Sequence, residues 1–265
     1  MSTQPGSAAG GYLLKRIPAG ATGRTFFQSY VLTASDESIL QAAAKEDSFR
    51  YAYNGVLSFL GGLSGLCSHG AGWAITKMYY STFYIARACL CRSGHLIFHV
   101  PKGGTSSHTQ YELKVAAGER AEISRIQSTH KLVADRFKRG GYPRFMQGLV
   151  VDGEDPLEWL MAQREFWQYR SARFPDPDFP SILAEIDTQR LQRFLSAYEE
   201  DGPGVYLSDP DHALVAIPFR LVIWYLSGTS FESAGVFTPE DFAHLRRSCI
   251  AGGQKVTAIG RHFGK

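Results

Sequence analysis

Apolar residues recur along much of the chain with the three- and four-residue spacing of amphipathic helices. Over residues 49–63 this spacing relates Phe49, Val56 and Leu60, and the glycines of GGLSG then end the segment. Just before it, the cap-like sequence SDES predicts a separate helix over residues 36–48. The pattern therefore predicts two consecutive helices.

A longer helix is predicted from about residue 72 to residue 92, in GWAITKMYYSTFYIARACLCR. At about 100° per residue, one broad face of this helix collects the following side chains: Ile75, Met78, Tyr79, Thr82, Phe83, Ala86 and Cys89. This aromatic-rich face is typical of a helix that packs against a partner helix.

The period changes in the segments on either side of these helices. LIFHV and YELKV, separated by a polar loop, predict a β-hairpin within residues 96–117. RTFFQSYVLT, residues 24–33, has the composition of a strand or an extended arm, and MSTQPGSAAGG at the start has that of a flexible tail. The sequence therefore predicts a small β insertion in a mainly helical chain.

A third helix is predicted from about Ala121 to Arg139. Its apolar side is formed by Ile126, His130, Val133 and Phe137. On such a face His130 is either a core histidine that donates to a backbone carbonyl or a functional base.

The fourth helix has the clearest start, because DPLE places Asp155 at the N-cap, Pro156 at the first helical position and Glu158 three residues after the cap. After the prolines at 175–180 we expect helices over residues 181–200, over 211–226 with a kink at Pro218, and from TPED at residue 238 onward.

The fourth helix has apolar residues on two opposite faces. One is formed by Leu157, Leu160, Met161 and Trp167 with Arg164 among them, and the other by Trp159, Ala162, Phe166 and Tyr169. A buried guanidinium is costly unless it is paired. We therefore expect a partner for Arg164, either a carboxylate such as Asp135 or Glu46 or a ligand phosphate, and a protein partner or second copy against Trp159, Phe166 and Tyr169.

Three stretches together resemble the HEPN superfamily: KMYYSTFYIARACL, STHKLVADRFKRGG and LMAQREFWQYRSARF. Prokaryotic members have an aromatic helix, a helix that opens with Thr-His or Ser-His, and a last helix with Arg, three variable residues, a polar residue and Tyr. The resemblance implies a four-helix up-and-down bundle over residues 49–174, with the β insertion at 96–117. We expect residues 1–48 to form a flexible tail, an extended arm and a short helix, and residues 175–265 to form a helical C-terminal region.

The resemblance also implies dimerisation and, in catalytic members, metal-independent RNA cleavage by an Arg followed four to six residues later by His. In this sequence the Arg is Arg164, but the position five residues on is Tyr169. Tyrosine, with an ordinary pKa near 10, is a poor general base at neutral pH. Catalysis would therefore need Tyr169 or His130 as the second group.

Composition limits the remaining possibilities. The net charge of +3 permits a nucleic-acid partner without requiring one. The basic stretch that could follow a phosphate backbone comprises Lys131, Arg136, Lys138, Arg139 and Arg144, with Tyr142 and Phe145 as candidates for stacking on bases. The same cations are also typical of the solvent face and C-terminal end of a helix.

The four cysteines are too few and too irregularly spaced for a disulfide framework. Cys89, Cys91, His95 and His99 lack the spacing of a zinc knuckle, so buried free cysteines are the simpler interpretation and no metal or cofactor is expected. No apolar run is long enough to cross a membrane, and the start of the chain lacks the features of a signal peptide, so we expect a cytoplasmic protein.

Two functional hypotheses follow. The first is a HEPN-like interaction module, a homodimer or hetero-complex subunit of a bacterial antiphage defence or toxin–antitoxin assembly. The second is a HEPN-type endoribonuclease toxin that uses Arg164 with Tyr169 or His130. The absence of histidine from the fourth helix favours the first.

Overall fold

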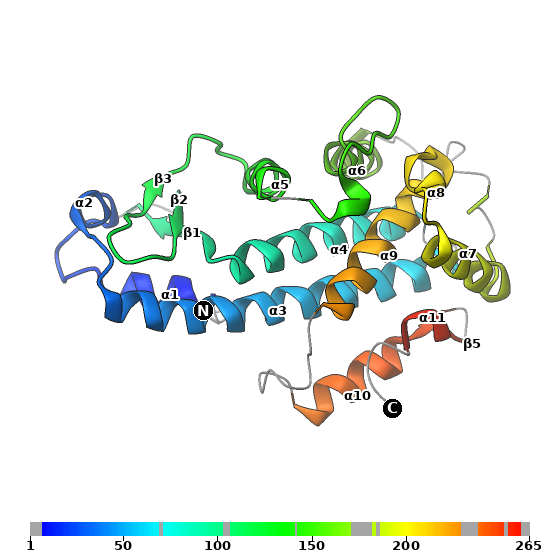
Figure 1. The fold of residues 1–265 in the computed structure, drawn as a ribbon, viewed down its shortest axis with the longest axis horizontal. Coiled ribbons are helices and arrows are strands. Elements are labelled where there is room, and N and C mark those ends of the chain that lie inside the picture. Colours follow the sequence, from blue (N-terminus) through cyan, green and yellow to red (C-terminus); the bar gives the residue numbers. More distant parts are fainter. Residues whose placement is uncertain are drawn as a thin grey trace. The chain divides into compact units, whose positions relative to one another are not determined.

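The computed structural model describes residues 7–68, 71–102, 107–140, 142–170, 182–183, 186–228, 238–251 and 254–260. This part of the chain is mainly helical and contains a small three-stranded antiparallel sheet, as predicted (Figure 1). The four-helix HEPN bundle stays a prediction.

The residues group into two compact units. Unit 1 comprises residues 1–51 and 86–140, and unit 2 comprises residues 52–85 and 141–265. Two long helices, α3 (Ala34–Leu66) and α4 (Ala71–Arg92), contribute one end to each unit. The units therefore divide the chain differently from the boundaries expected after residues 48 and 174.

Helix α3 replaces the two helices expected over residues 36–48 and 49–63. The junction, AAAKEDSFR, contains no glycine or proline, and its alanines favour a continuous helix. The helix is capped at its start by a reciprocal pair, because the Asp36 amide donates to Thr33 Oγ1 (3.1 Å) and the Thr33 amide donates to Asp36 Oδ2 (3.0 Å).

Unit 1 is an α+β arrangement in which helices cover both faces of the sheet. Besides its ends of α3 and α4, it contains α1 (Ala8–Lys15), α2 (Gly23–Ser29), β1 (His95–Pro101), β2 (His108–Lys114), β3 (Glu122–Ile123) and α5 (Thr129–Arg139). The strands lie in the order β1-β2-β3, with His99 opposite Gln110 and Ile97 opposite Glu112. The predicted hairpin is confirmed and has a third strand.

Three sequence-based expectations in unit 1 were wrong. The flexible tail ends earlier than expected, because α1 begins at Ala8 with its first amides donating to the buried carboxylate of Asp47. Residues 24–29 form a helix, α2, because Thr22 caps it and Phe27 is buried. Helix α5 begins at Thr129 instead of Ala121, because the preceding residues pair with β2 and Ser128 supplies the N-cap.

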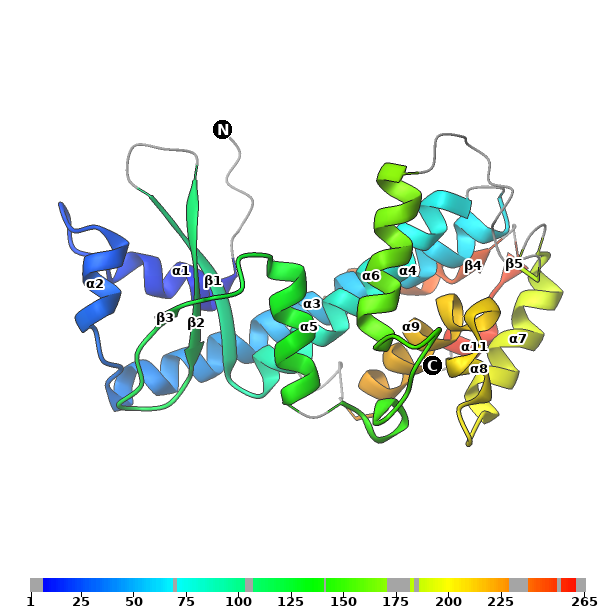
Figure 2. The same cartoon turned by 90° about the horizontal axis from the view of Figure 1, so that it is seen from above.

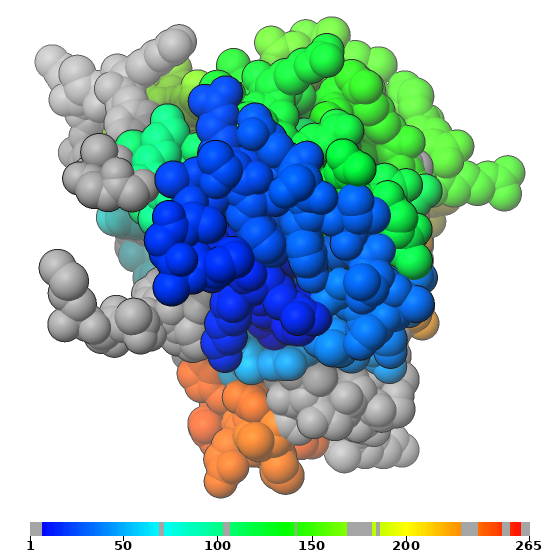
Figure 3. Space-filling model, turned by 90° about the vertical axis from the view of Figure 1, so that its left-hand side faces the viewer, coloured from blue at the N-terminus to red at the C-terminus, as the bar shows by residue number. Residues whose placement is uncertain are grey.

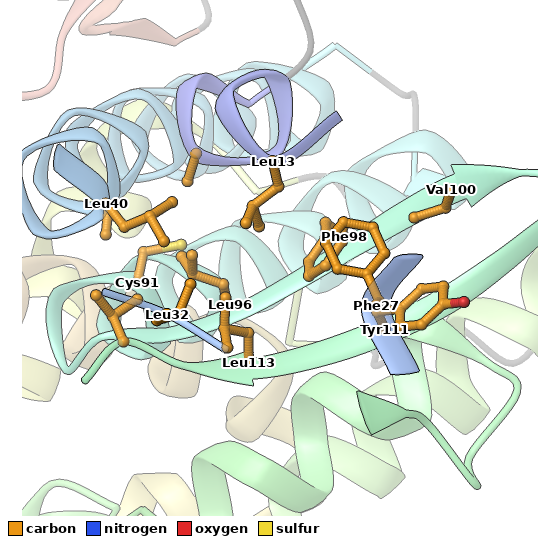
Figure 4. Close-up of a cluster of buried hydrophobic side chains, with 13 residues drawn as sticks. Leu13, Phe27, Leu32, Leu40, Cys91, Leu96, Phe98, Val100, Tyr111 and Leu113 are labelled. Atoms are coloured by element: carbon orange, nitrogen blue, oxygen red, sulfur yellow. The ribbon is translucent and has the colours of Figure 1, made fainter. Parts of the chain in front are cut away.

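The core of unit 1 lies between the sheet and α1, α2 and α3, where side chains from all of these elements point toward one another (Figure 4). It consists of Ala9, Leu13, Phe27, Leu32, Leu40, Ala44, Cys91, Leu96, Phe98, Val100, Tyr111, Leu113 and Val115. In the space-filling view the blue N-terminal residues lie directly against green residues from the β-hairpin onward (Figure 3). The N-terminal segment is therefore part of the folded unit.

The described residues of unit 2 form helices and one short hairpin, joined by loops. Besides its ends of α3 and α4, it contains η1 (Arg144–Met146), α6 (Pro156–Glu165), the π-helical turn η2 (Phe166–Arg170), α7 (Thr188–Glu200), α8 (Val205–Ser208), α9 (Pro210–Ser227), α10 (Pro239–Ser248), β4 (Ile250–Ala251), β5 (Gln254–Lys255) and α11 (Thr257–Gly260).

Helix α9 forms the centre of unit 2. It is buried along most of its length, and its Phe219 stacks on Phe59 of α3 at 5.9 Å between ring centroids. The helix continues through Pro218. The TPED cap of α10 is confirmed, with Thr238 and Asp241 as a reciprocal pair, whereas α7 begins at Thr188, later than the expected residue 181.

Gly23, at the start of α2, packs against the sheet so closely that it provides a test of the unit 1 core. A Cβ at this position would lie 2.1 Å from Cγ1 of Val100. We expect Gly23→Ala to lower the free energy of unfolding by about 1–3 kcal/mol, because the buried valine would have to move out of the sheet. Urea denaturation measures the change.

The matched control is Gly11→Ala in α1, where an added Cβ meets nothing within 4 Å. Because alanine is the better helix former, this substitution should raise the free energy of unfolding by about 0.5–1 kcal/mol. Equal stability of the Gly23→Ala variant and the wild type would contradict the close packing of α2 on the sheet.

Candidate functional site

Helix α6 begins where the sequence predicts. The Asp155 carboxylate accepts from the Leu157 amide (3.0 Å) and from the Tyr142 hydroxyl (2.8 Å), and Pro156 occupies the first helical position. The cap is therefore tied to the segment that precedes the helix. This bond uses the hydroxyl of Tyr142, which is a buried side chain and so does not form a base-stacking surface.

Arg164 lies on the buried side of α6, where the helix crosses the N-terminal half of α4 (Figure 2). Its side chain is 8% exposed, and Nε donates to Gln168 Oε1 at 2.9 Å. The guanidinium lies over two rings of α4, 5.4 Å from the centroid of Tyr79 and 5.8 Å from that of Tyr80. An amide oxygen and two aromatic faces thus contact the buried cation.

The carboxylates expected to pair with Arg164 are used elsewhere. Asp135 accepts from Arg136 and Arg139, and Glu46 accepts from Arg50 at 2.5 Å. Pairing of Arg164 with either carboxylate therefore stays a prediction. Cation–π attraction grows when the cation is removed from water, so aromatic faces provide part of the stabilisation that a carboxylate would give.

The described contacts of Arg164 do not include a base suited to neutral pH. Burial raises the pKa of Tyr79 well above its usual value, although the charge and hydrogen bond of Arg164 partly oppose the shift. The amide of Gln168 does not titrate. His130 belongs to unit 1 and Arg164 to unit 2, while the side chain of Tyr169 lies outside the described residues. Catalysis with either partner stays a prediction.

The second apolar face of α6 differs from the expected one. Trp159 is buried, and its Nε1 donates to Asp152 Oδ2 at 3.3 Å. Phe166 is 41% exposed, with its ring in edge contact with Trp167. The expected exposure of this face is therefore wrong for Trp159 and confirmed for Phe166.

The structure exposes a surface of α4 that the sequence analysis did not select. We call it the α4 stripe: Trp73, Lys77, Tyr80 and Tyr84. Trp73 is 67% exposed, Lys77 is exposed, and the two tyrosines are half-buried with their rings stacked at 6.0 Å. The stripe lies on the side of α4 opposite the predicted buried face. The helical periodicity that predicts the buried face therefore also identifies the stripe.

The predicted basic stretch is divided between the units and partly neutralised. Arg144 is exposed but belongs to unit 2, where the ring of nearby Phe145 lies under the Arg220 guanidinium, 5.2 Å from the centroid. In unit 1, Arg136 binds Glu112 through Nε (2.5 Å) and Nη2 (3.1 Å) and also pairs with Asp135.

The other three cations of the stretch lie on the solvent side of α5. Lys131 and Lys138 are exposed, and Arg139, whose side chain is 71% exposed, pairs with Asp135 at 3.0 Å. The exposed side of α5 therefore keeps its positive charges, whereas the ion pair of Arg136 with Glu112 joins the helix to β2.

The cysteine–histidine set does not form a metal centre in the described residues, which contain no group of three or more His, Cys, Asp or Glu side chains placed to hold an ion. Burial raises the pKa of the Cys89 and Cys91 thiols to about 12, which disfavours the thiolate that a metal would need. His95 contacts Glu112 (3.3 Å) and His99 contacts Gln110 (3.1 Å). These four residues are therefore interpreted as structural.

The packing of Arg164 predicts a large effect on stability. Arg164→Ala should lower the free energy of unfolding by about 2–4 kcal/mol, because it removes the buried side chain together with its ring contacts and its hydrogen bond to Gln168. Urea denaturation measures this, with Arg193→Ala on the exposed side of α7 as the control, expected within about 0.5 kcal/mol of the wild type. Equal effects of the two substitutions would show that Arg164 contributes no more to the free energy of unfolding than an exposed arginine.

Two further findings concern membrane spans and similarity to known proteins. Among the described helices, none is both long and apolar enough to span a bilayer. Comparisons with protein-family models, with curated proteins and with solved structures found no match to the chain.

Proposed function

We propose that the chain is a HEPN-like interaction module, a subunit of a bacterial antiphage defence or toxin–antitoxin assembly, that associates with a second copy through the α4 stripe. The observation that supports this most directly is the 67% exposure of Trp73. Tryptophan is enriched among the residues that dominate binding energies.

The rest of the stripe extends the apolar surface away from Trp73. Tyr80 lies seven residues further along α4, on the same side of the helix and about 10.5 Å away. Its ring is contacted by the Arg164 guanidinium and stacked on Tyr84. A surface whose rings are held by intramolecular contacts loses little side-chain entropy on binding, which favours affinity.

Arg164 has a positioning role in this proposal. The helix crossing of α4 and α6 is held by one guanidinium that contacts two rings and one amide. The Arg and the polar residue of the HEPN-like motif, Arg164 and Gln168, thus bond to each other. This supports a structural use of the motif in this chain.

The endoribonuclease alternative uses the same arginine differently. It needs a base near the guanidinium, from Tyr169 or from His130. The Nε of Arg164 donates to the Gln168 amide oxygen, which is not a base, and burial raises the pKa of neighbouring Tyr79. The fourth-helix sequence contains no histidine, so we prefer the interaction module.

Trp73 gives a direct test of self-association. In sedimentation experiments over a concentration series, the wild-type chain should dimerise, and Trp73→Ala should raise the dissociation constant about 30-fold or more, since a central tryptophan contributes about 2 kcal/mol or more. Trp224→Ala is the matched control, because Trp224 on α9 is also exposed (41%) but lies outside the stripe.

Two outcomes would contradict this surface. A wild-type chain that stays monomeric at every concentration excludes self-association. Equal weakening by Trp73→Ala and Trp224→Ala would mean that the loss of exposed apolar area, and not the α4 stripe, determines association.

Incubation of the purified chain with total RNA in EDTA separates the two functions. The interaction module predicts that wild type and Arg164→Lys, which keeps the charge but not the planar fork, give the same low background of cleavage. Metal-independent cleavage that is present in the wild type and lost in a folded Arg164→Lys variant would replace the interaction module by the ribonuclease.

A further inference from the structure

The formal charge is distributed unevenly between the two units. Unit 1 contains 15 lysines and arginines against eight aspartates and glutamates, which leaves +7, whereas unit 2 contains 13 against 17, which leaves −4. The sum is the +3 of the whole chain. A domain with this excess of cations attracts polyanions, and the attraction is hidden in the net charge of the chain.

The acidic groups of unit 1 are largely used within the unit. Six of the eight accept hydrogen bonds or ion pairs from residues of the same unit: Asp36, Glu37, Glu46, Asp47, Glu112 and Asp135. Asp36 and Asp47 are also buried, with 1% and 2% of their surface exposed. Exposed cations therefore dominate the charge that unit 1 presents to solvent.

The clearest group of these cations is on α5. We define the α5 outer face as Lys131, Asp135, Lys138 and Arg139, which lie within about 100° of one another around the helix axis. Asp135, the one acid on this face, is shared by Arg136 and Arg139. The apolar side of the helix, with Leu132, Val133 and Phe137, is buried.

The helix dipole does not account for this arrangement. It favours cations in the last turn, where Lys138 and Arg139 lie, and disfavours them in the first turn. Lys131 is nevertheless in the first turn, which contains no acidic residue. A stripe of cations that runs from one end of the helix to the other is better explained by an external anion.

We propose that the α5 outer face binds the phosphodiester backbone of double-stranded nucleic acid. Lys131 and Lys138 are separated by about 10.5 Å along the helix, and a duplex presents one phosphate charge for about every 1.7 Å of its axis, so both lysines meet phosphates of one bound duplex. None of the exposed large apolar side chains among the described residues of unit 1 is aromatic. Phosphate contacts therefore predominate over base stacking, which single-stranded ligands need.

An anionic membrane is the less suitable partner. Helices that lie in a membrane surface combine a basic flank with an apolar face that enters the lipid. The apolar face of α5 packs inside unit 1, and its outer face consists of charged side chains. The inference is independent of the proposed self-association, since α5 belongs to unit 1 and the α4 stripe to unit 2.

The test measures binding of the full chain to fluorescent duplex RNA and duplex DNA of the same mixed sequence, by anisotropy, as a function of salt. If about three phosphates are neutralised, affinity should fall about 40-fold between about 50 and about 200 mM salt. In Lys131→Gln/Lys138→Gln the same change in salt should weaken binding only about 3-fold, because about one contact remains. Similar binding of both duplexes identifies the backbone as the ligand, and a preference for RNA adds contacts to its 2′-hydroxyls.

Two matched variants define the controls. Lys131→Arg/Lys138→Arg keeps both charges and should retain the salt dependence of the wild type. Arg193→Gln/Arg246→Gln removes the same charge from exposed positions of unit 2 and should also leave it unchanged. Circular dichroism confirms that each variant is folded.

Three results would overturn the proposal. The first is the absence of duplex binding by the wild type at low salt. The second is an equal loss of salt dependence in the unit 2 control, which would mean that any cation of the chain contributes. The third is binding to phosphatidylserine vesicles without binding to either duplex, which would assign the face to a membrane.

Discussion

Removal of the Arg164 guanidinium from water is the constraint on which the candidate site depends. The charge must be compensated, and the chain does so with an amide oxygen and two tyrosine faces. These contacts connect α6 to Tyr79 and Tyr80 of α4, and Tyr80 belongs to the α4 stripe. The same cation therefore contacts both helices of the pair.

The sequence predicts those features of the fold that local chemistry decides. The caps at Asp155 and Thr238, the helix from Ala71 to Arg92 and the β-hairpin all follow from side chains within a few residues of one another. The errors concern segments whose structure is decided by distant partners. Residues 24–29 have strand-like composition but form a helix that buries Phe27 on the sheet, and residues 122–123 pair with β2 instead of starting a helix.

The candidate site was predictable in part for the same reason. Periodicity alone places Arg164 on a buried face, and the structure confirms its burial. The identity of its neighbours requires the tertiary arrangement of α4 and α6, so its contacts with the rings of Tyr79 and Tyr80 were not predicted. The charge separation could not be predicted either, because unit 1 is assembled from two segments separated by 34 residues, and neither the chain order nor the total charge shows them as one body.

The π-helical turn after α6 has a consequence for how motifs on this helix are counted. In such a turn backbone hydrogen bonds join residues five apart, one more than in an α-helix, so the helix is wider and its faces change phase at Phe166. A residue five positions after an arginine therefore lies at a different angle around the helix axis here than on a regular α-helix. A π-helical turn is thus one means by which a sequence motif can acquire a new geometry.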